Sequence, residues 1–233
     1  MREDVAHHEW SIDQREIDRH VARRGREHAY VRLDPRTTAL VVVDVVPFFV
    51  EESAYVRGIL PKVNRLAGAL RAEGGTVAWV VPRTTAPSPV TREFFGDRVA
   101  ELYSQSGGAG APRERLWRGL DVDPADVVVD KSGPSAFFPG TCDLHDLLAA
   151  RAIATLVVTG TVTNVCVEST VRDASALGYR VVLVADGCAA VRDRDHDATL
   201  HVVYRSFGDV RATDDVLALI QAGGLEPGHA DVL

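Results

Sequence analysis

Residues 156–173, with the sequence LVVTGTVTNVCVESTVRD, constrain the fold more than any other segment of the chain. The segment begins as a short apolar, β-branched run that breaks at Gly160. The apolar residues that follow recur at helical spacing and would share one face of a helix: Val167, Val171, Ala174 and Leu177. This pattern predicts a buried strand, a tight turn and then a helix.

Cys166 falls in the first turn of that predicted helix. A helix N-terminus carries a partial positive charge and unpaired N–H groups, and both favour a thiolate over a thiol. Cys166 is therefore a candidate nucleophile. A free cysteine can equally be an inert core residue, so the rest of the chain must distinguish the two interpretations.

The rest of the chain alternates between strands and helices. Apolar runs predict strands at 39–46, 76–81, 127–131, 156–160, 179–185 and near 210, and helical patterns cover 59–73, 143–150, 193–205 and 213–221. Runs that are continuously apolar are typical of strands covered on both faces. We therefore expect an α/β fold with a doubly wound, mainly parallel sheet and helices on both faces, a three-layer α/β/α arrangement.

Three reactive side chains fall at the carboxyl ends of three predicted strands: Asp44, Lys131 and Cys166. Ligands of open α/β sheets bind along this edge. A carboxylate at the end of a buried strand is costly unless it is paired, bound to metal or used in chemistry. Each residue has a plain structural alternative, but their convergence at one edge predicts a catalytic site. A nucleotide-binding domain is disfavoured because no glycine-rich loop follows the first strand.

Residues 83–120 are rich in proline, glycine, serine and charged residues, and no strong periodicity is visible in them. So long an irregular segment inside an α/β unit is typical of a lid or a substrate loop. Its aromatic residues could close over a ligand, although whether the loop moves is left open by the sequence. Phe48 and Phe49 could wall an apolar pocket or could belong to the core.

The two ends of the chain differ in character from its centre. Residues 1–35 are charged and predict an arm that packs on the domain or reaches to a second subunit, with His7 and His8 at the surface. Residues 36–222 are expected to form the domain, and residues 223–233 a frayed tail.

Composition narrows the class of protein. The net charge of −7 gives no attraction for phosphate backbones or anionic lipid, which disfavours nucleic acid and membrane partners. The three cysteines lack the spacing of a disulfide framework. No apolar signal core is visible at the N-terminus, and we expect a cytoplasmic protein.

With these motifs in view, residues 36–220 resemble the isochorismatase-like cysteine hydrolases, which include nicotinamidases, N-carbamoylsarcosine amidohydrolases and ureidoacrylate amidohydrolases. The resemblance is carried by Asp44, by Lys131 followed by SAFF, and above all by residues 159–173. It implies an Asp44–Lys131–Cys166 triad that hydrolyses a C–N bond of a small molecule, in an amide, a ureido or carbamoyl group or a lactam, through a thioester. It also implies a homodimer or homotetramer, and no cofactor.

The same resemblance implies an oxyanion hole. In the family, two backbone N–H groups hold the oxyanion, one from the nucleophile and one beside a cis peptide bond. Mapped onto this chain, these are the N–H groups of Cys166 and Val162, with the cis bond between Thr161 and Val162.

Departures from the family pattern bear on the substrate. Nicotinamidases carry an Asp-x-His metal motif where this chain reads VVPRTTAPSP, so no metal is expected. Members that cleave the vinyl ether of isochorismate lack the cysteine, which favours C–N hydrolysis. Vinyl ether hydrolysis and a catalytically silent binding protein are the remaining alternatives. The expected pocket residues are Phe49, Arg83, Trp117, Phe137 and Phe138, and Arg83 could pair with a substrate carboxylate.

Overall fold

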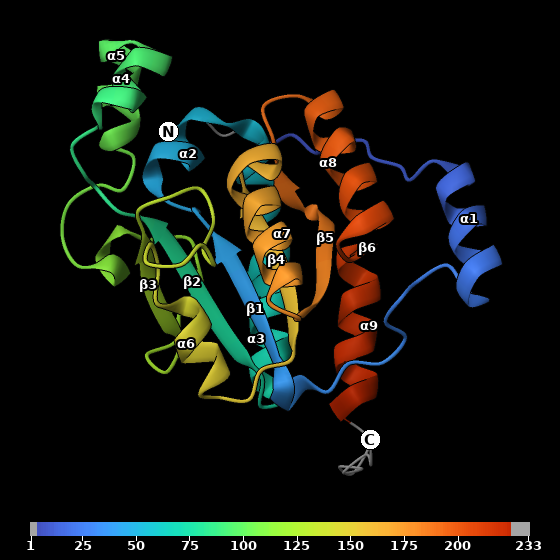
Figure 1. Cartoon of the computed structure of the whole chain (residues 1–233). Coiled ribbons are helices and arrows are strands. Elements are labelled where there is room, and N and C mark those ends of the chain that lie inside the picture. Colours follow the sequence, from blue (N-terminus) through green and yellow to red (C-terminus); the bar gives the residue numbers. More distant parts are fainter. Residues whose placement is uncertain (1–3, 225–233) are drawn as a thin grey trace.

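The computed structural model describes residues 4–224. Its centre is a six-stranded sheet in the order β3-β2-β1-β4-β5-β6, and every neighbouring pair of strands is parallel (Figure 1). This is the doubly wound α/β sheet that the sequence predicts.

The elements have the following bounds. The strands are β1 (Thr38–Val43), β2 (Thr76–Pro82), β3 (Val127–Lys131), β4 (Thr155–Thr161), β5 (Arg180–Ala189) and β6 (Asp209–Arg211). The α-helices are α1 (Gln14–Arg24), α2 (Pro47–Glu52), α3 (Ala54–Ala72), α4 (Pro89–Phe95), α5 (Asp97–Ser104), α6 (Leu144–Ala149), α7 (Glu168–Ala176), α8 (Asp193–Ser206) and α9 (Thr213–Gly224). Short turns of other helix types are η1 (Pro35–Thr37), η2 (Pro112–Arg115) and η3 (Thr163–Val167).

Helices cover both faces of the sheet and produce two cores. One face packs against α6, α7 and α8, and the other packs against α3 and α9. The central strand β1 is buried along its whole length because it lies between β2 and β4 and under both helical layers. Its continuous apolar sequence follows from that position.

Gly160 lies where β4 comes closest to β1. Its φ is +119°, and a side chain at this position would place its Cβ 2.1 Å from the carbonyl oxygen of Val43. The strand continues past this glycine to Thr161, so the sequence-based break at Gly160 is wrong. Glycine is needed here for close approach of two strands rather than for a turn.

The chain leaves β1 earlier than expected. The strand ends at Val43, and Asp44 adopts a left-handed backbone conformation with φ of 58°. Aspartate tolerates this conformation better than most residues with a side chain. The turn leads into α2, which the sequence analysis missed.

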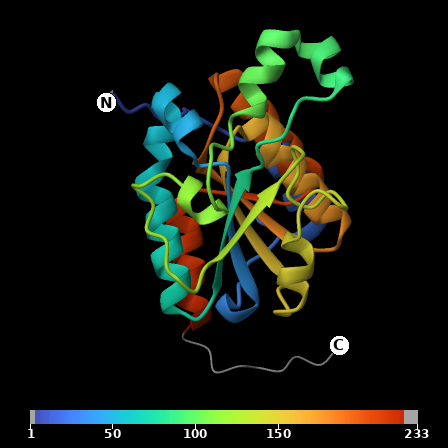
Figure 2. The same cartoon turned by 90° about the vertical axis from the view of Figure 1, so that its left-hand side faces the viewer.

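Residues 83–120 are more regular than expected, because they contain α4, α5 and η2. Ser88 caps α4, and Gly96 with φ of 75° separates α4 from α5. The two helices lie beyond the carboxyl ends of β2 and β3 (Figure 2). Phe94 is 79% exposed, so the aromatic residues here do not form a closed cover.

The ends of the described chain pack on the same domain. Trp10, Ile12 and Ile17 lie against one core, and α9 packs beside α3 on the other. Gly223 and Gly224 are part of α9, and the rest of the expected tail, residues 225–233, lies outside the described residues. Within residues 4–224, no helix is long and apolar enough to span a membrane.

Candidate active site

The candidate site begins with an ion pair at the carboxyl ends of two strands. Lys131, the last residue of β3, places its Nζ 2.8 Å from Oδ2 of Asp44, just past β1. The two side chains are only 2% and 1% exposed. A buried pair of this kind loses the hydration of both charges, so it is weak evidence for stability and draws attention to function.

Cys166 completes the cluster. It lies in η3, a π-helical turn that joins β4 to α7, and the peptide bond before this turn, between Thr161 and Val162, is cis. The thiol interacts with both Asp44 and Lys131. The three residues that the sequence analysis placed at one edge therefore meet there. The expected first helical turn is instead π-helical, a local form often found at functional sites.

The ionisation of this cluster differs from the sequence-based expectation. Burial is the main cause that raises the pKa of the Cys166 thiol to about 12, the negative charge of Asp44 acts in the same direction, and Lys131 opposes both. The resting sulfur is therefore a thiol, and the expectation of a thiolate favoured by the helix N-terminus is wrong. The buried Lys131 does not outweigh the lost hydration and the charge of Asp44.

Burial also raises the pKa of Asp44, although Lys131 and Cys166 act in the other direction. For Lys131, burial alone would lower the pKa, but Asp44 and Cys166 outweigh that effect and the net change is a rise. A carboxylate whose pKa is raised accepts a proton from a thiol more readily than an ordinary aspartate does.

One oxygen of Asp44 has no conventional partner. Within residues 4–224, the buried Oδ1 atom makes no hydrogen bond of standard geometry, and the Cys166 thiol also interacts with this carboxyl group. Catalytic hydrogen bonds are often loose before substrate binds. The free lone pair leaves Asp44 able to take a proton.

Arg83 is engaged by a carboxylate of the chain itself. Its Nε and Nη2 atoms donate to Oδ1 of Asp130 at 2.9 and 2.6 Å, and the buried Arg115 donates to Oδ2 at 2.8 Å. Arg115 also binds the carbonyl oxygen of Pro82, so this network ties residues 83–120 to the ends of β2 and β3. The sequence analysis missed Asp130 and Arg115, because a charged residue in a polar segment gives no signal of its partner.

The four predicted aromatic pocket residues separate into two groups. Phe137 is 3% exposed and packs against Tyr179 in the core, so it does not wall an open pocket. Phe49 and Trp117 are partly buried. The backbone N–H of Trp117 donates to the carbonyl oxygen of Val45, the residue after Asp44. Phe138 is 57% exposed. A substrate role for Phe49, Trp117 and Phe138 stays a prediction.

Sequence reasoning also missed a histidine behind the nucleophile. His196 in α8 is fully buried, and its Nδ1 atom lies 3.0 Å from Oγ1 of Thr163, the first residue of η3. The expected surface position of His8 is wrong, because its side chain is only 2% exposed. Among residues 4–224, no three His, Cys, Asp or Glu side chains are grouped so as to hold a metal ion.

Comparison with known proteins agrees with this geometry. The family model described as the isochorismatase domain matches residues 38–215. The chain belongs to the isochorismatase family.

Individual relatives point to hydrolases. The ureidoacrylate amidohydrolase RutB of Rhizobium rhizogenes is 30% identical over 213 residues, which cover 82% of this chain and 86% of that protein. An N-carbamoylsarcosine amidase of an Arthrobacter species is 34% identical over 173 residues, 70% of this chain and 62% of the relative. The crystal structure of a cysteine hydrolase from Pseudomonas syringae pv. phaseolicola superposes with a TM-score of 0.71, at 28% identity, and covers 84% of this chain and 98% of that one. This isochorismatase-family chain is accordingly a hydrolase.

Proposed function

We propose that this hydrolase cleaves a C–N bond of a small amide, ureido or carbamoyl compound, with Cys166 as nucleophile. The observation that carries the proposal is the thiol beside the buried Asp44–Lys131 pair, at the edge of the sheet where ligands of this fold bind. The ureidoacrylate and N-carbamoylsarcosine relatives support the choice of C–N hydrolysis.

The first half-reaction follows from the ionisation of the cluster. Because the resting thiol is protonated, Asp44 takes the Cys166 proton as the sulfur attacks the carbonyl carbon. Lys131 keeps a positive charge beside both groups and stabilises the negative charge that develops. In this proposal the N–H groups of Val162 and Cys166 hold the oxyanion, and one such donor typically contributes about 3 kcal/mol.

Loss of the leaving group completes the first half-reaction, and hydrolysis of the acyl enzyme then returns the enzyme to its resting state. Asp44 passes its proton to the leaving nitrogen, which departs as ammonia or an amine and leaves the acyl group on sulfur as a thioester, or as a thiocarbamate from a ureido group. Water then attacks the same carbonyl, the S–C bond breaks, and the thiol regains its proton. The overall reaction consumes one water and releases an acid and an amine.

The test is a small substrate panel with two readouts. Ureidoacrylate, N-carbamoylsarcosine, simple carboxamides and isochorismate are incubated with the wild type and with Cys166→Ala, and ammonia, amine and pyruvate release are measured. Rapid quenching followed by mass spectrometry should find the acyl group on Cys166. Turnover that survives in Cys166→Ala, or cleavage of isochorismate alone, would contradict the proposal, and a complete lack of turnover would favour a silent binding protein.

A further inference from the structure

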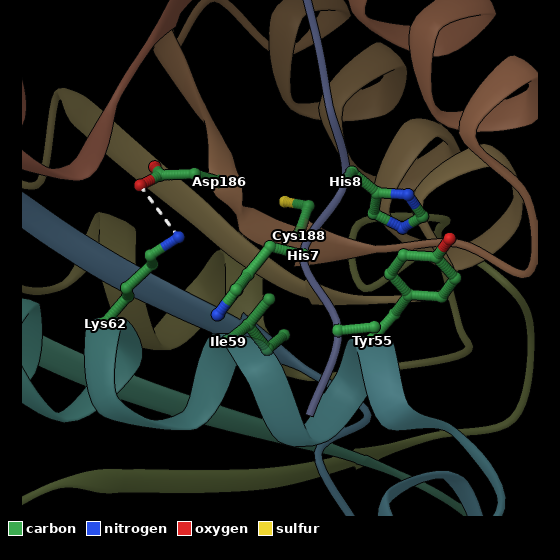
Figure 3. Close-up of a pocket in the computed structure, with 8 residues that line it drawn as sticks. His7, His8, Tyr55, Ile59, Lys62, Asp186 and Cys188 are labelled. Atoms are coloured by element: carbon green, nitrogen blue, oxygen red, sulfur yellow. Dashed lines mark ion pairs between the residues drawn. The ribbon is translucent and has the colours of Figure 1, made fainter. Parts of the chain in front are cut away.

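His8 is inserted between two rings of the domain. Its imidazole stacks on Tyr55 of α3 at a centroid distance of 3.9 Å and on His196 of α8 at 4.3 Å, with interplanar angles of 5° and 13°. Figure 3 shows the N-terminal segment, residues 4–10, running beside α3, with the His8 ring next to the Tyr55 ring. A side chain so close to the N-terminus is thereby built into the interior.

The two hydrogen bonds of His8 fix the position of its proton. The Ala190 N–H donates to Nε2 at 2.9 Å, so Nε2 carries no proton, and Nδ1 donates to Asp193 at 2.6 Å. Ala189, the neighbour of Ala190, accepts a hydrogen bond from Oγ1 of Thr161 at 3.1 Å. His8 therefore binds the residue next to Ala189, and Ala189 in turn binds Thr161, which precedes the cis peptide bond.

The second connection runs through His196. Burial is the main cause that lowers the pKa of His196 to about 3, so the ring is neutral and carries a single proton. Its Nδ1 shares a hydrogen bond with the Thr163 hydroxyl at 3.0 Å, and the buried ring also interacts with the backbone of Ala185.

The two connections meet on either side of Val162. One reaches Thr161 through Ala189, and the other reaches Thr163 through His196, so both flank the N–H group that would hold the oxyanion. Resting on the function proposed above, we propose that His8 and His196 are positioning residues that hold the η3 turn, with its N–H donors and its nucleophile, in the reactive geometry.

The N-terminal segment is fitted to α3 by a close backbone contact. The Ala6 N–H donates to the carbonyl oxygen of Ala54 at 3.1 Å, and a Cβ at Gly58 would lie 2.0 Å from the carbonyl oxygen of Ala6. A single added methyl group at position 58 must therefore move the segment. We expect Gly58→Ala to shift His8 together with this segment, while the sequence of the segment and the residues of the catalytic cluster stay unchanged.

The experiment compares His8→Ala and Gly58→Ala with the wild type, using N-carbamoylsarcosine or ureidoacrylate, whichever the wild type hydrolyses faster. Groups that stabilise only the transition state affect kcat more than KM. We expect kcat per folded molecule to fall by about 10- to 10²-fold, as misplacement of catalytic groups by about 1 Å can do, with KM changed by less than about twofold. His8→Gln, whose side-chain oxygen can accept the Ala190 N–H, should recover part of kcat.

His7→Ala is the matched control, because His7 is the exposed neighbour of His8 and makes none of these contacts. It should leave kcat unchanged. If His8→Ala and Gly58→Ala only lower the melting temperature and keep the wild-type kcat, the segment is a stabilising strap and the inference is overturned.

A second readout separates this inference from the proposed reaction. The rate at which iodoacetamide alkylates Cys166, followed by mass spectrometry of the intact folded protein, requires no turnover. We expect it to rise at least about threefold in His8→Ala and Gly58→Ala, but not in His7→Ala, because a loosened turn exposes the thiol. Equal rates in all four proteins would refute the inference even if no compound of the panel were hydrolysed, and a changed rate without turnover would support it while the proposed function failed.

Discussion

Asp44 and Asp209 are equally buried aspartates at the sheet, yet their surroundings differ. Both oxygens of Asp209 are bonded, Oδ1 to His28 at 3.0 Å and Oδ2 to the Arg211 guanidinium at 3.2 Å. Asp44 has Lys131 on Oδ2, whereas its Oδ1 makes no standard hydrogen bond within residues 4–224, and the Cys166 thiol interacts with the carboxyl group. The same residue type at the same depth is thus fully bonded in one place and incompletely bonded in the other.

The pKa values move in opposite directions as a result. Burial would raise the pKa of Asp209, but His28, Arg211 and the Tyr30 N–H outweigh it and hold that pKa below its usual value. At Asp44, burial prevails and the pKa is raised. The difference teaches that low solvent exposure alone does not define the role of a carboxylate, because its hydrogen-bond and charge partners decide whether burial prevails.

The largest expected effect tests the thiol that Asp44 faces. Cys166→Ala should reduce kcat by more than about 10⁴-fold, because no other described side chain in the cluster can form the acyl intermediate. Cys188→Ala is the control, since Cys188 is buried in β5 and its thiol donates to the Val158 carbonyl oxygen. Steady-state kinetics on the best compound of the panel measures both. Comparable losses in the two variants would remove the distinction between a working and a structural thiol.

The next effect tests the two aspartates directly. Asp44→Asn should lower kcat by between about 10²- and 10⁴-fold, because the base is lost while the shape is kept. Asp209→Asn should leave kcat per folded molecule close to that of the wild type. The proposed difference between the two aspartates would be contradicted if Asp44→Asn kept the wild-type kcat, or if Asp209→Asn lowered kcat as much as Asp44→Asn does.

Substitution of Asp209 should instead lower the stability of the folded protein. Asp209→Asn leaves the buried Arg211 side chain without its counter-charge, and we expect the free energy of unfolding to fall by about 3 kcal/mol at neutral pH. The folded-state pKa of Asp209 is depressed, so this contribution is complete above the unfolded pKa of about 3.9 and is lost as the pH falls through the folded value. The gap between variant and wild type should therefore narrow in acid.

Urea unfolding at several pH values measures that gap. Asp214→Asn serves as the control, because Asp214 is 81% exposed and pairs with an exposed Arg65. Exposed pairs contribute little, so its effect should be below about 1 kcal/mol at every pH. A gap for Asp209→Asn that stays constant down to strong acid would show that its carboxylate is not held in the charged form.

The smallest effect is a shift of the pH profile. Lys131 lowers the pKa of Asp44 against the effect of burial, so Lys131→Met should move the acid limb of kcat/KM to higher pH. Lys62→Met removes a lysine paired with Asp186 at 3.1 Å, outside the catalytic cluster, and should leave the limb in place. An acid limb that does not move in Lys131→Met would argue against Asp44 as the titrating base.

The sequence predicted those parts of the site that depend on topology. Asp44, Lys131 and Cys166 each follow a continuously apolar strand, and parallel strands bring their carboxyl ends to one edge. The ionisation of Cys166 was not predictable in this way. Its pKa depends on how deeply the sulfur is buried, and a sequence pattern gives no measure of that depth.

Other features were hidden because their partners are distant in sequence or their signals are short. The rings of His8 and His196 stack although the two residues are far apart in the sequence, and the local sequence around either histidine does not predict this contact. The helices α4 and α5 are brief and lie among prolines and glycines, so composition predicted a loop. Ser88 before Pro89, a common start of a helix, was the available clue.

The interior position of His8 has a practical consequence for handling the protein. A purification tag fused ahead of the chain would begin only a few residues from a ring stacked against the support of the reactive turn. The end of α9 lies near η1 and the start of β1, at the end of the sheet opposite α2 (Figure 1). Turnover measured with tags at the two termini should therefore differ, and a tag at the carboxyl terminus is the safer choice for any assay of this enzyme.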